Sequence, residues 1–247
     1  MKITISILTS ALVLSTSISA QEPKEVFLGG TFSGSAGIAT DSVFRGESTV
    51  VDGDIPAISA GFSWTHNDGF YVGVSGATSQ YTSTPDIRST VSPYIGKFGT
   101  LADTGINYNT VLYHYIYPGA ENSNYTELWI EADKDFGPVN LKVEVTPTLD
   151  DWFGVDGWSG VNYAIHPSTT FDNGITLSAA IGYQDLSGED AEGWTHWNMG
   201  VSKTVFGLTL DLRYHDSDMD SSHKVYSSPE GIDIFEQRII LGVSKSY

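Results

Sequence analysis

The residues that could carry out catalysis are few and poorly arranged. Six histidines stand at positions 66, 114, 166, 196, 215 and 223, and none has the spacing of paired metal ligands. No nucleophile, zinc-protease or phosphate-loop motif occurs in a usable context. The acid–base candidate is His215 beside Asp216 and Asp218, because a nearby carboxylate can orient an imidazole as a general base. Ordinary polar residues in an exposed loop are the favoured interpretation, so no enzyme is predicted.

Acidic residues gather between the apolar segments. The run DSDMD at 216–220 places carboxylates at the first, third and fifth positions of a calcium loop. Ser221 and Ser227 stand where such a loop needs Gly and Glu, so neither a metal site nor a cofactor is predicted. Solvated acidic loops that gather divalent cations are favoured. Such cations could bridge the loops to anionic lipopolysaccharide.

Composition excludes several classes of protein. The 247 residues include 12 Lys and Arg against 30 Asp and Glu, a formal charge of −18. Nucleic acid is not an expected partner, because neutralising phosphates requires clustered basic residues. The absence of Cys excludes a disulfide scaffold, a thiol nucleophile and a Cys zinc site. Hydrophobic residues make up 40% of the chain, which argues against disorder.

The first 20 residues indicate export. Residues 1–20 combine an early Lys, an apolar stretch and a small polar end at Ala20, the pattern of a secretory signal peptide. Residues 21–247 are then expected to form one domain. No later segment approaches the length of about 18 apolar residues that a membrane helix needs. An exported chain can still cross a membrane as a closed β-barrel that satisfies its own backbone hydrogen bonds.

Period-two alternation dominates the exported part. In 207–216, Leu208, Leu210 and Leu212 oppose Thr209, Asp211 and Arg213. Turn-formers separate similar segments, and twelve strands are predicted at 32–41, 55–65, 70–80, 88–98, 104–116, 125–135, 138–147, 158–167, 174–184, 194–204, 207–216 and 233–246. Five short connections alternate with six longer polar ones. This rhythm predicts an all-β fold, a transmembrane antiparallel up-and-down barrel with short periplasmic turns and longer extracellular loops.

The polar face of these strands predicts a wet lumen. The pore-lining candidates on it are Glu127, Trp129, Glu131, Asp133, Lys142, Glu144, Asp211, Arg213, Glu236 and Arg238. A soluble β-sandwich or a lipocalin-like barrel also alternates, but a soluble barrel fills its interior with apolar side chains. Tyr71 also faces inward by parity. The aromatics expected at the membrane interfaces are Phe62, Trp64, Phe70, Tyr113, Tyr115, Tyr163, Tyr183, Trp197 and Tyr214.

The segment Phe44-Arg45-Gly46 follows the first predicted strand. Arg45 could fold into the lumen and meet acids such as Asp41, forming part of a constriction. The alternative is that Arg45 pairs locally and fixes the loop, with Gly46 enabling a turn. Local pairing is the favoured interpretation.

Two blocks of sequence resemble a known family. The blocks SGSAGIATDSVFRGESTV with DIPAISAGFSWTHNDGFYVGVSGAT, at 33–50 and 54–78, and YHYIYPGAENSNYTELWIEADKDFGPVNLKVEV, at 113–145, resemble the TorF-like family of porins, also called the Gcw_chp family. The resemblance covers most of the exported chain. It implies a proteobacterial outer-membrane β-barrel with a porin role, and the family name is linked to trimethylamine oxide metabolism.

These observations predict a narrow channel in the bacterial outer membrane. Acids outnumber bases among the lumen candidates, and charge rings set the sign of what passes. Small cationic, zwitterionic or neutral solutes are expected to diffuse through, and inward Trp129 and Tyr71 could meet methylated amines through cation–π contact. A non-conducting structural or adhesive barrel is the alternative, and a barrel enzyme has the least support. Expected partners are outer-membrane lipid, lipopolysaccharide and, through the strand ending at Tyr247, the barrel-assembly machinery.

Overall fold

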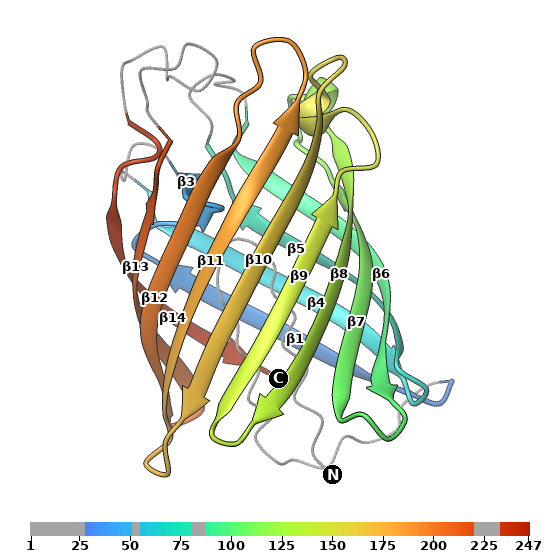
Figure 1. Ribbon diagram of the computed structural model, residues 1–247, viewed down its shortest axis with the longest axis vertical. Helices are drawn as coiled ribbons and strands as arrows, with labels where there is room; N and C mark the ends of the chain where they lie inside the picture. The colour runs from blue at the N-terminus through green and yellow to red at the C-terminus, as the bar shows by residue number, and fades with distance from the viewer. Residues whose placement is uncertain (1–27, 51–54, 81–86, 220–232) are drawn as a thin grey trace.

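Twelve long strands close into one antiparallel barrel (Figure 1). The structure is a computed structural model that describes residues 28–50, 55–80, 87–219 and 233–247, so the predicted signal peptide lies outside the described residues. The barrel strands are β1 (Gly30–Ala39), β4 (Ala57–His66), β5 (Phe70–Thr78), β6 (Ser89–Leu101), β7 (Ile106–Tyr115), β8 (Tyr125–Phe136), β9 (Val139–Pro147), β10 (Ser159–Thr170), β11 (Ile175–Ser187), β12 (Trp194–Val205), β13 (Leu208–Ser217) and β14 (Arg238–Ser246). All twelve predicted strands are confirmed, with shifted ends.

The outer face of the barrel is apolar. In β13, Leu208, Leu210 and Leu212 are 41–47% exposed, whereas Arg213, which follows Leu212, is buried inside. β14 follows the same rule with Ile239 and Leu241 outside. Such a continuous apolar surface is unfavourable in water and favourable against lipid tails, and closure leaves no unpaired sheet edge in the bilayer. The chain is therefore an outer-membrane barrel. No helix in the described ranges is long and apolar enough to cross a membrane.

The connections alternate in length as predicted. The five short turns lie at one end of the barrel, and each contains a glycine with positive φ: Gly69, Gly105, Gly137, Gly174 and Gly207. The longer connections lie at the other end, at the top of Figure 1. They include the short helices η1 (Glu121–Ser123) and η2 (Trp152–Gly154). The chain ends at Tyr247, on the short-turn side.

The ring closes through a short seam. β1 pairs with β14 over five residue pairs, from Ser35 with Ser246 to Ala39 with Gly242. Its other edge pairs with β4 over ten. Two backbone hydrogen bonds between Gly34 and Tyr247 extend the seam by one step.

Part of the lumen holds an aromatic core. Tyr71, Tyr94, Tyr113, Tyr115, Tyr125 and Trp129 are all at most 9% exposed and belong to one cluster with Trp152, Trp158 and Trp194. Tyr71 packs over Gly96 and Tyr94 over Gly73, where any Cβ would collide with the ring. Tyr113 and Tyr115 were predicted at the membrane interface, and that prediction is wrong. Their parity points inward, so they fill the β5–β8 side of the barrel.

Candidate functional site: the lumen and its inward hairpin

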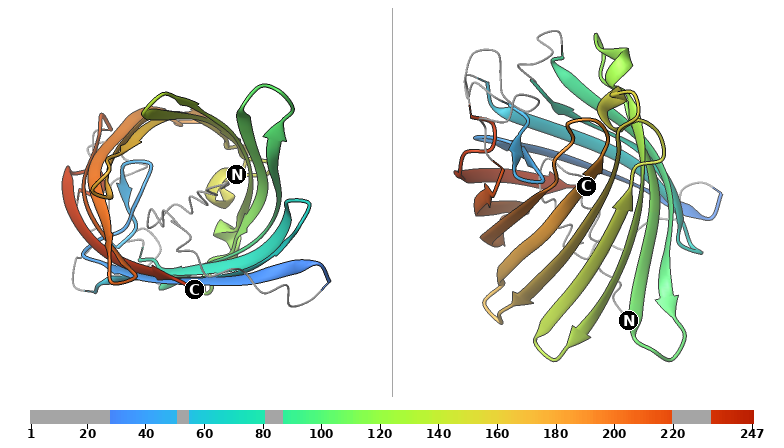
Figure 2. Two further views of the ribbon diagram at one scale, coloured as in Figure 1. Left: turned by 90° about the horizontal axis from the view of Figure 1, so that it is seen from below. Right: turned by 45° about the horizontal axis from the view of Figure 1, so that its top comes forward.

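The connection between β1 and β4 folds into the barrel. It contains the hairpin β2 (Val43–Phe44) and β3 (Glu47–Ser48), which appears inside the ring in the left view of Figure 2. Arg45 and Gly46 form its tip with φ of 51° and 88°. A Cβ on Gly46 would lie 2.7 Å from Cβ of Ser217 on β13, so a glycine lets the tip approach the wall.

Arg45 joins the hairpin to the barrel wall. Its Nη1 lies 2.8 Å from Oε1 of Glu127 on β8, and its Nη2 donates to Oε2 of the same carboxylate at 3.1 Å. Nη1 also donates to Oε1 of Gln184 on β11 at 2.9 Å. Trp194 Nε1 donates to the carbonyl oxygen of Arg45 at 2.7 Å. The pair is buried, with side-chain exposures of 5% for Arg45 and 0% for Glu127.

These contacts decide between the two interpretations of Arg45. It lies in the lumen and pairs with a residue 82 positions away, so the favoured local pairing is wrong. Asp41 is not its partner. Asp41 instead forms an ion pair with Arg238 at 3.2 Å and accepts hydrogen bonds from the backbone of Ser42 and the hydroxyl of Ser48.

The other lumen acids are also engaged. Lys142 lies 2.6 Å from Glu131, and Arg213 lies 3.1 Å from Asp211. Asp133 accepts hydrogen bonds from the amides of Asn107 and Asn140.

Glu144 is held mainly by neutral groups. Its Oε1 accepts from Thr146 and Asn162, and its Oε2 lies 3.2 Å from Nε2 of His166. In the described part of the chain, neither Asp133 nor Glu144 forms an ion pair with Lys or Arg. Six carboxylates (Asp41, Glu127, Glu131, Asp133, Glu144 and Asp211) meet four cations (Arg45, Lys142, Arg213 and Arg238). This set carries a formal excess of two negative charges.

Of two further residues predicted to line the pore, Trp129 lies in the lumen and Glu236 does not. Trp129 faces inward and is 4% exposed, within the aromatic core. Glu236 is exposed and lies in the turn that precedes β14, because that strand begins at Arg238 and not at 233. Glu236 therefore does not line the barrel wall.

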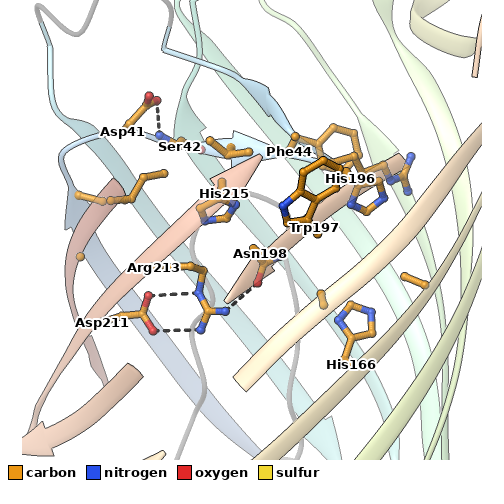
Figure 3. A pocket seen from close by; sticks show the side chains of 18 of the residues that line it. Asp41, Ser42, Phe44, His166, His196, Trp197, Asn198, Asp211, Arg213 and His215 are labelled. Atoms are coloured by element: carbon orange, nitrogen blue, oxygen red, sulfur yellow. Dashed lines mark hydrogen bonds and ion pairs between the residues drawn. The ribbon is translucent and has the colours of Figure 1, made fainter. Parts of the chain in front are cut away.

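A cavity of about 120 Å³ separates the hairpin from the wall (Figure 3). The hairpin contributes Phe44, Arg45 and Gly46 to its lining. The barrel contributes mostly polar groups, including Glu144, Asn162, His166, His196, Asn198, Asp211, Arg213 and His215. His196 Nε2 lies 2.8 Å from Oδ1 of Asn162. This cavity therefore lies across the lumen from the tyrosines of β5–β7.

The geometry does not assemble the acid–base pair considered for His215. Its side chain lines the cavity, whereas Asp216 accepts a hydrogen bond from Tyr214 and Asp218 accepts one from the backbone of Thr195. The calcium-like run extends into residues 220–232, outside the described residues. Within the described ranges, no group of three or more His, Asp or Glu is arranged to hold a metal ion.

Glu47 makes the hairpin sensitive to pH. Burial raises the pKa of Glu47 to about 8 from 4.5, so the docked hairpin holds a proton that a released hairpin loses. Docking is therefore strongest below about pH 4.5 and weakens as the pH rises to about 8. We expect conductance through the barrel to increase over this window. Glu47→Gln should flatten that increase. An unchanged pH profile in this variant would contradict the assignment.

Several comparisons place the fold. The solved KdgM porin has 10% sequence identity and a TM-score of 0.58, over 87% of this chain and 99% of that chain. The NanC porin has 8% identity and a TM-score of 0.55, over 87% and 98%. A KdgM porin in complex with disordered oligogalacturonate has 8% identity and a TM-score of 0.57, over 87% and 98%. At these identities the likeness shows the fold alone.

Comparison of the sequence with curated proteins and with protein families identifies one family. No curated protein matches the chain. Residues 24–247 match the family described as "Bacterial protein of unknown function (Gcw_chp)", whereas the TorF-like label stays a prediction. A match over this length, together with the closed twelve-stranded barrel, shows that the chain belongs to the Gcw_chp family.

Proposed function

We propose that this protein is a porin-like channel for passive diffusion of small cationic, zwitterionic or neutral solutes. The observation that carries the proposal is a cavity inside a closed barrel whose lining sets the carboxylates of Asp41, Glu144 and Asp211 against the cations of Arg45 and Arg213. Acidic lumen groups favour cations, because a narrow, partly dehydrated path strengthens their attraction. Each of the four lumen cations named above is paired with a carboxylate, which disfavours polyanions in the described part of the lumen.

The path for solutes lies on one side of the lumen. Tyr71 packs between Tyr94 and Phe98, and the Arg45 guanidinium lies 5.5 Å from the centroid of the Trp129 ring. Groups of the chain itself thus occupy the two aromatic faces that were expected to meet methylated amines. The cavity beside Glu144 offers the remaining polar route.

Glu144→Gln should reduce cation preference without rebuilding the site. Gln can still accept from Asn162 and Thr146, so the change removes one charge at nearly constant volume. In planar bilayers with a KCl gradient, we expect the reversal potential to move towards zero. Lys134→Gln, on the outer face of β8, is the matched control and should leave the reversal potential unchanged. Equal reversal potentials for wild type and Glu144→Gln would remove Glu144 from the path.

A non-conducting structural or adhesive barrel is the second candidate. The hairpin and the aromatic core favour it, because both occupy the lumen. Wild-type conductance separates the candidates: discrete cation-preferring steps support the channel, and silence from a folded, heat-modifiable barrel supports the structural role. Contact with lipopolysaccharide and assembly through the strand ending at Tyr247 are proposed for either.

A further inference from the structure

We propose that Glu127, Gln184 and Trp129 form a binding site for small guanidinium solutes, and that Arg45 occupies this site as a removable internal plug. The proposed guanidinium site is inferred from the contacts of Arg45 alone. Its consequence for transport rests on the proposed channel function. Guanidinium solutes are a narrower class than the small cations proposed above, because binding here requires N–H donors arranged in a planar fork.

The site presents three acceptors and one ring. Both oxygens of Glu127 and Oε1 of Gln184 accept from the two terminal nitrogens of Arg45, a two-point match to a guanidinium. Trp129 Nε1 donates to Glu127 Oε2 at 3.1 Å, which fixes the ring beside the carboxylate. Its ring lies 5.5 Å from the guanidinium carbon. A quaternary ammonium has no N–H, so it would donate to none of these acceptors. Glu127 Oε2 would keep its hydrogen bond from Trp129, whereas Glu127 Oε1 and Gln184 Oε1 would lose the donor that Arg45 supplies, at a cost in affinity.

Some features of the plug are unfavourable and oppose its ion pair with Glu127. Its two-residue strands pair with each other. Its described backbone hydrogen bonds to other segments include one from Trp194 Nε1 on β12 to the Arg45 carbonyl and one from the Ser48 N–H to the Ile234 carbonyl, in the turn before β14. Arg45 has positive φ, which is unfavourable for a residue with a Cβ. Its Nε is buried without a hydrogen-bond partner. These costs offset part of the ion-pair energy and make displacement feasible.

A solute can approach the plug from the lumen. The cavity of about 120 Å³ is lined by both Arg45 and Trp129, so removing the arginine side chain extends it to Glu127. In the wild type, a dissolved cation competes with a tethered one whose effective concentration is in the millimolar range or above. Binding should therefore be weak in the wild type and much stronger once Arg45 is shortened.

The test is methylguanidinium binding to refolded Arg45→Ala in detergent micelles. The readout is the thermal midpoint of the heat-modifiable gel shift, which a ligand of the folded state raises. Tetramethylammonium at equal ionic strength controls for screening.

The double variant Arg45→Ala/Glu127→Gln is the control for the site, because it keeps the cavity but lacks the carboxylate. We expect methylguanidinium to stabilise Arg45→Ala at concentrations about tenfold or more below those of tetramethylammonium. The double variant should lose this difference.

The outcomes separate the site from the channel. Equal responses to both cations, or none to either, would overturn the guanidinium site even if the barrel conducts. Selective stabilisation with no conductance would retain the site and reject the channel. If Arg45→Ala folds only when methylguanidinium is present during refolding, that rescue supports the proposal. If it folds in neither buffer, Arg45→Met replaces it, since Met fills part of the same space without a charge or an N–H donor, and an absent methylguanidinium preference there overturns the proposal.

Discussion

Glu127→Ala is expected to lower the free energy of unfolding by about 3–5 kcal/mol, because it leaves the buried Arg45 guanidinium without its counter-ion. The lost hydrogen bond from Trp129 Nε1 adds to this effect. Urea unfolding of the refolded barrel, followed by gel mobility and tryptophan fluorescence, measures the change.

Asp68→Asn is the matched control for this substitution. Asp68 lies in a short turn, its side chain is 55% exposed, and its carboxylate is 3.4 Å from Lys97. Solvent screens such a pair, so its loss should leave the unfolding midpoint unchanged. Equal effects of the two substitutions would mean that the Arg45–Glu127 pair does not hold the lumen together.

Replacing residues 43–48 with a short Gly-Ser linker should raise single-channel conductance severalfold. The hairpin forms one side of the cavity and reaches from β1 to Glu127 on β8, so its removal widens the narrow part of the lumen. The exposed Glu127 should also strengthen cation preference, because Arg45 leaves with the hairpin. Single-channel recording in planar bilayers measures both quantities.

The control for this deletion is a Gly-Ser replacement of residues 188–193. This loop joins β11 to β12 at the same end of the barrel and contributes no residue to the cavity lining. It should leave conductance close to the wild-type value. If removing the hairpin does not change conductance either, the constriction lies elsewhere in the barrel.

The sequence predicts the wall of this barrel better than its contents. Period-two alternation assigns faces from neighbouring residues alone, which is why the leucines of β13 are placed outside and Arg213 inside. The alternation of β7 also holds for Tyr113 and Tyr115, which lie inside. Their predicted place at the membrane interface is wrong because it rests on residue type, and aromatic residues suit both a membrane interface and a filled lumen. Glycines on the inward parity of β5 and β6 are a signal that could have located the aromatic core, since Gly73 and Gly96 make room for its rings.

The hairpin could not be predicted in the same way. Arg45 finds its partners 82 and 139 residues away, and no local pattern encodes a contact at that distance. Glu236 shows the related difficulty at strand ends, where a shift of a few residues moves a side chain from the wall into a turn. Loop conformation therefore depends on the finished barrel, whereas strand faces do not.

The short seam between the first and last strands determines how the ring is completed. With five residue pairs it has the fewest of the twelve ladders, and it joins segments about 200 residues apart. Pairing β1 with β14 closes a loop of about 200 residues and costs more chain entropy than forming a hairpin between neighbouring strands. We therefore expect neighbouring strands to pair first and the seam to form last. Until then, β1 and β14 both remain open edges that can pair with another chain. During folding, β1 and β14 are therefore the strands most exposed to aggregation, and pairing them with each other removes both open edges at once.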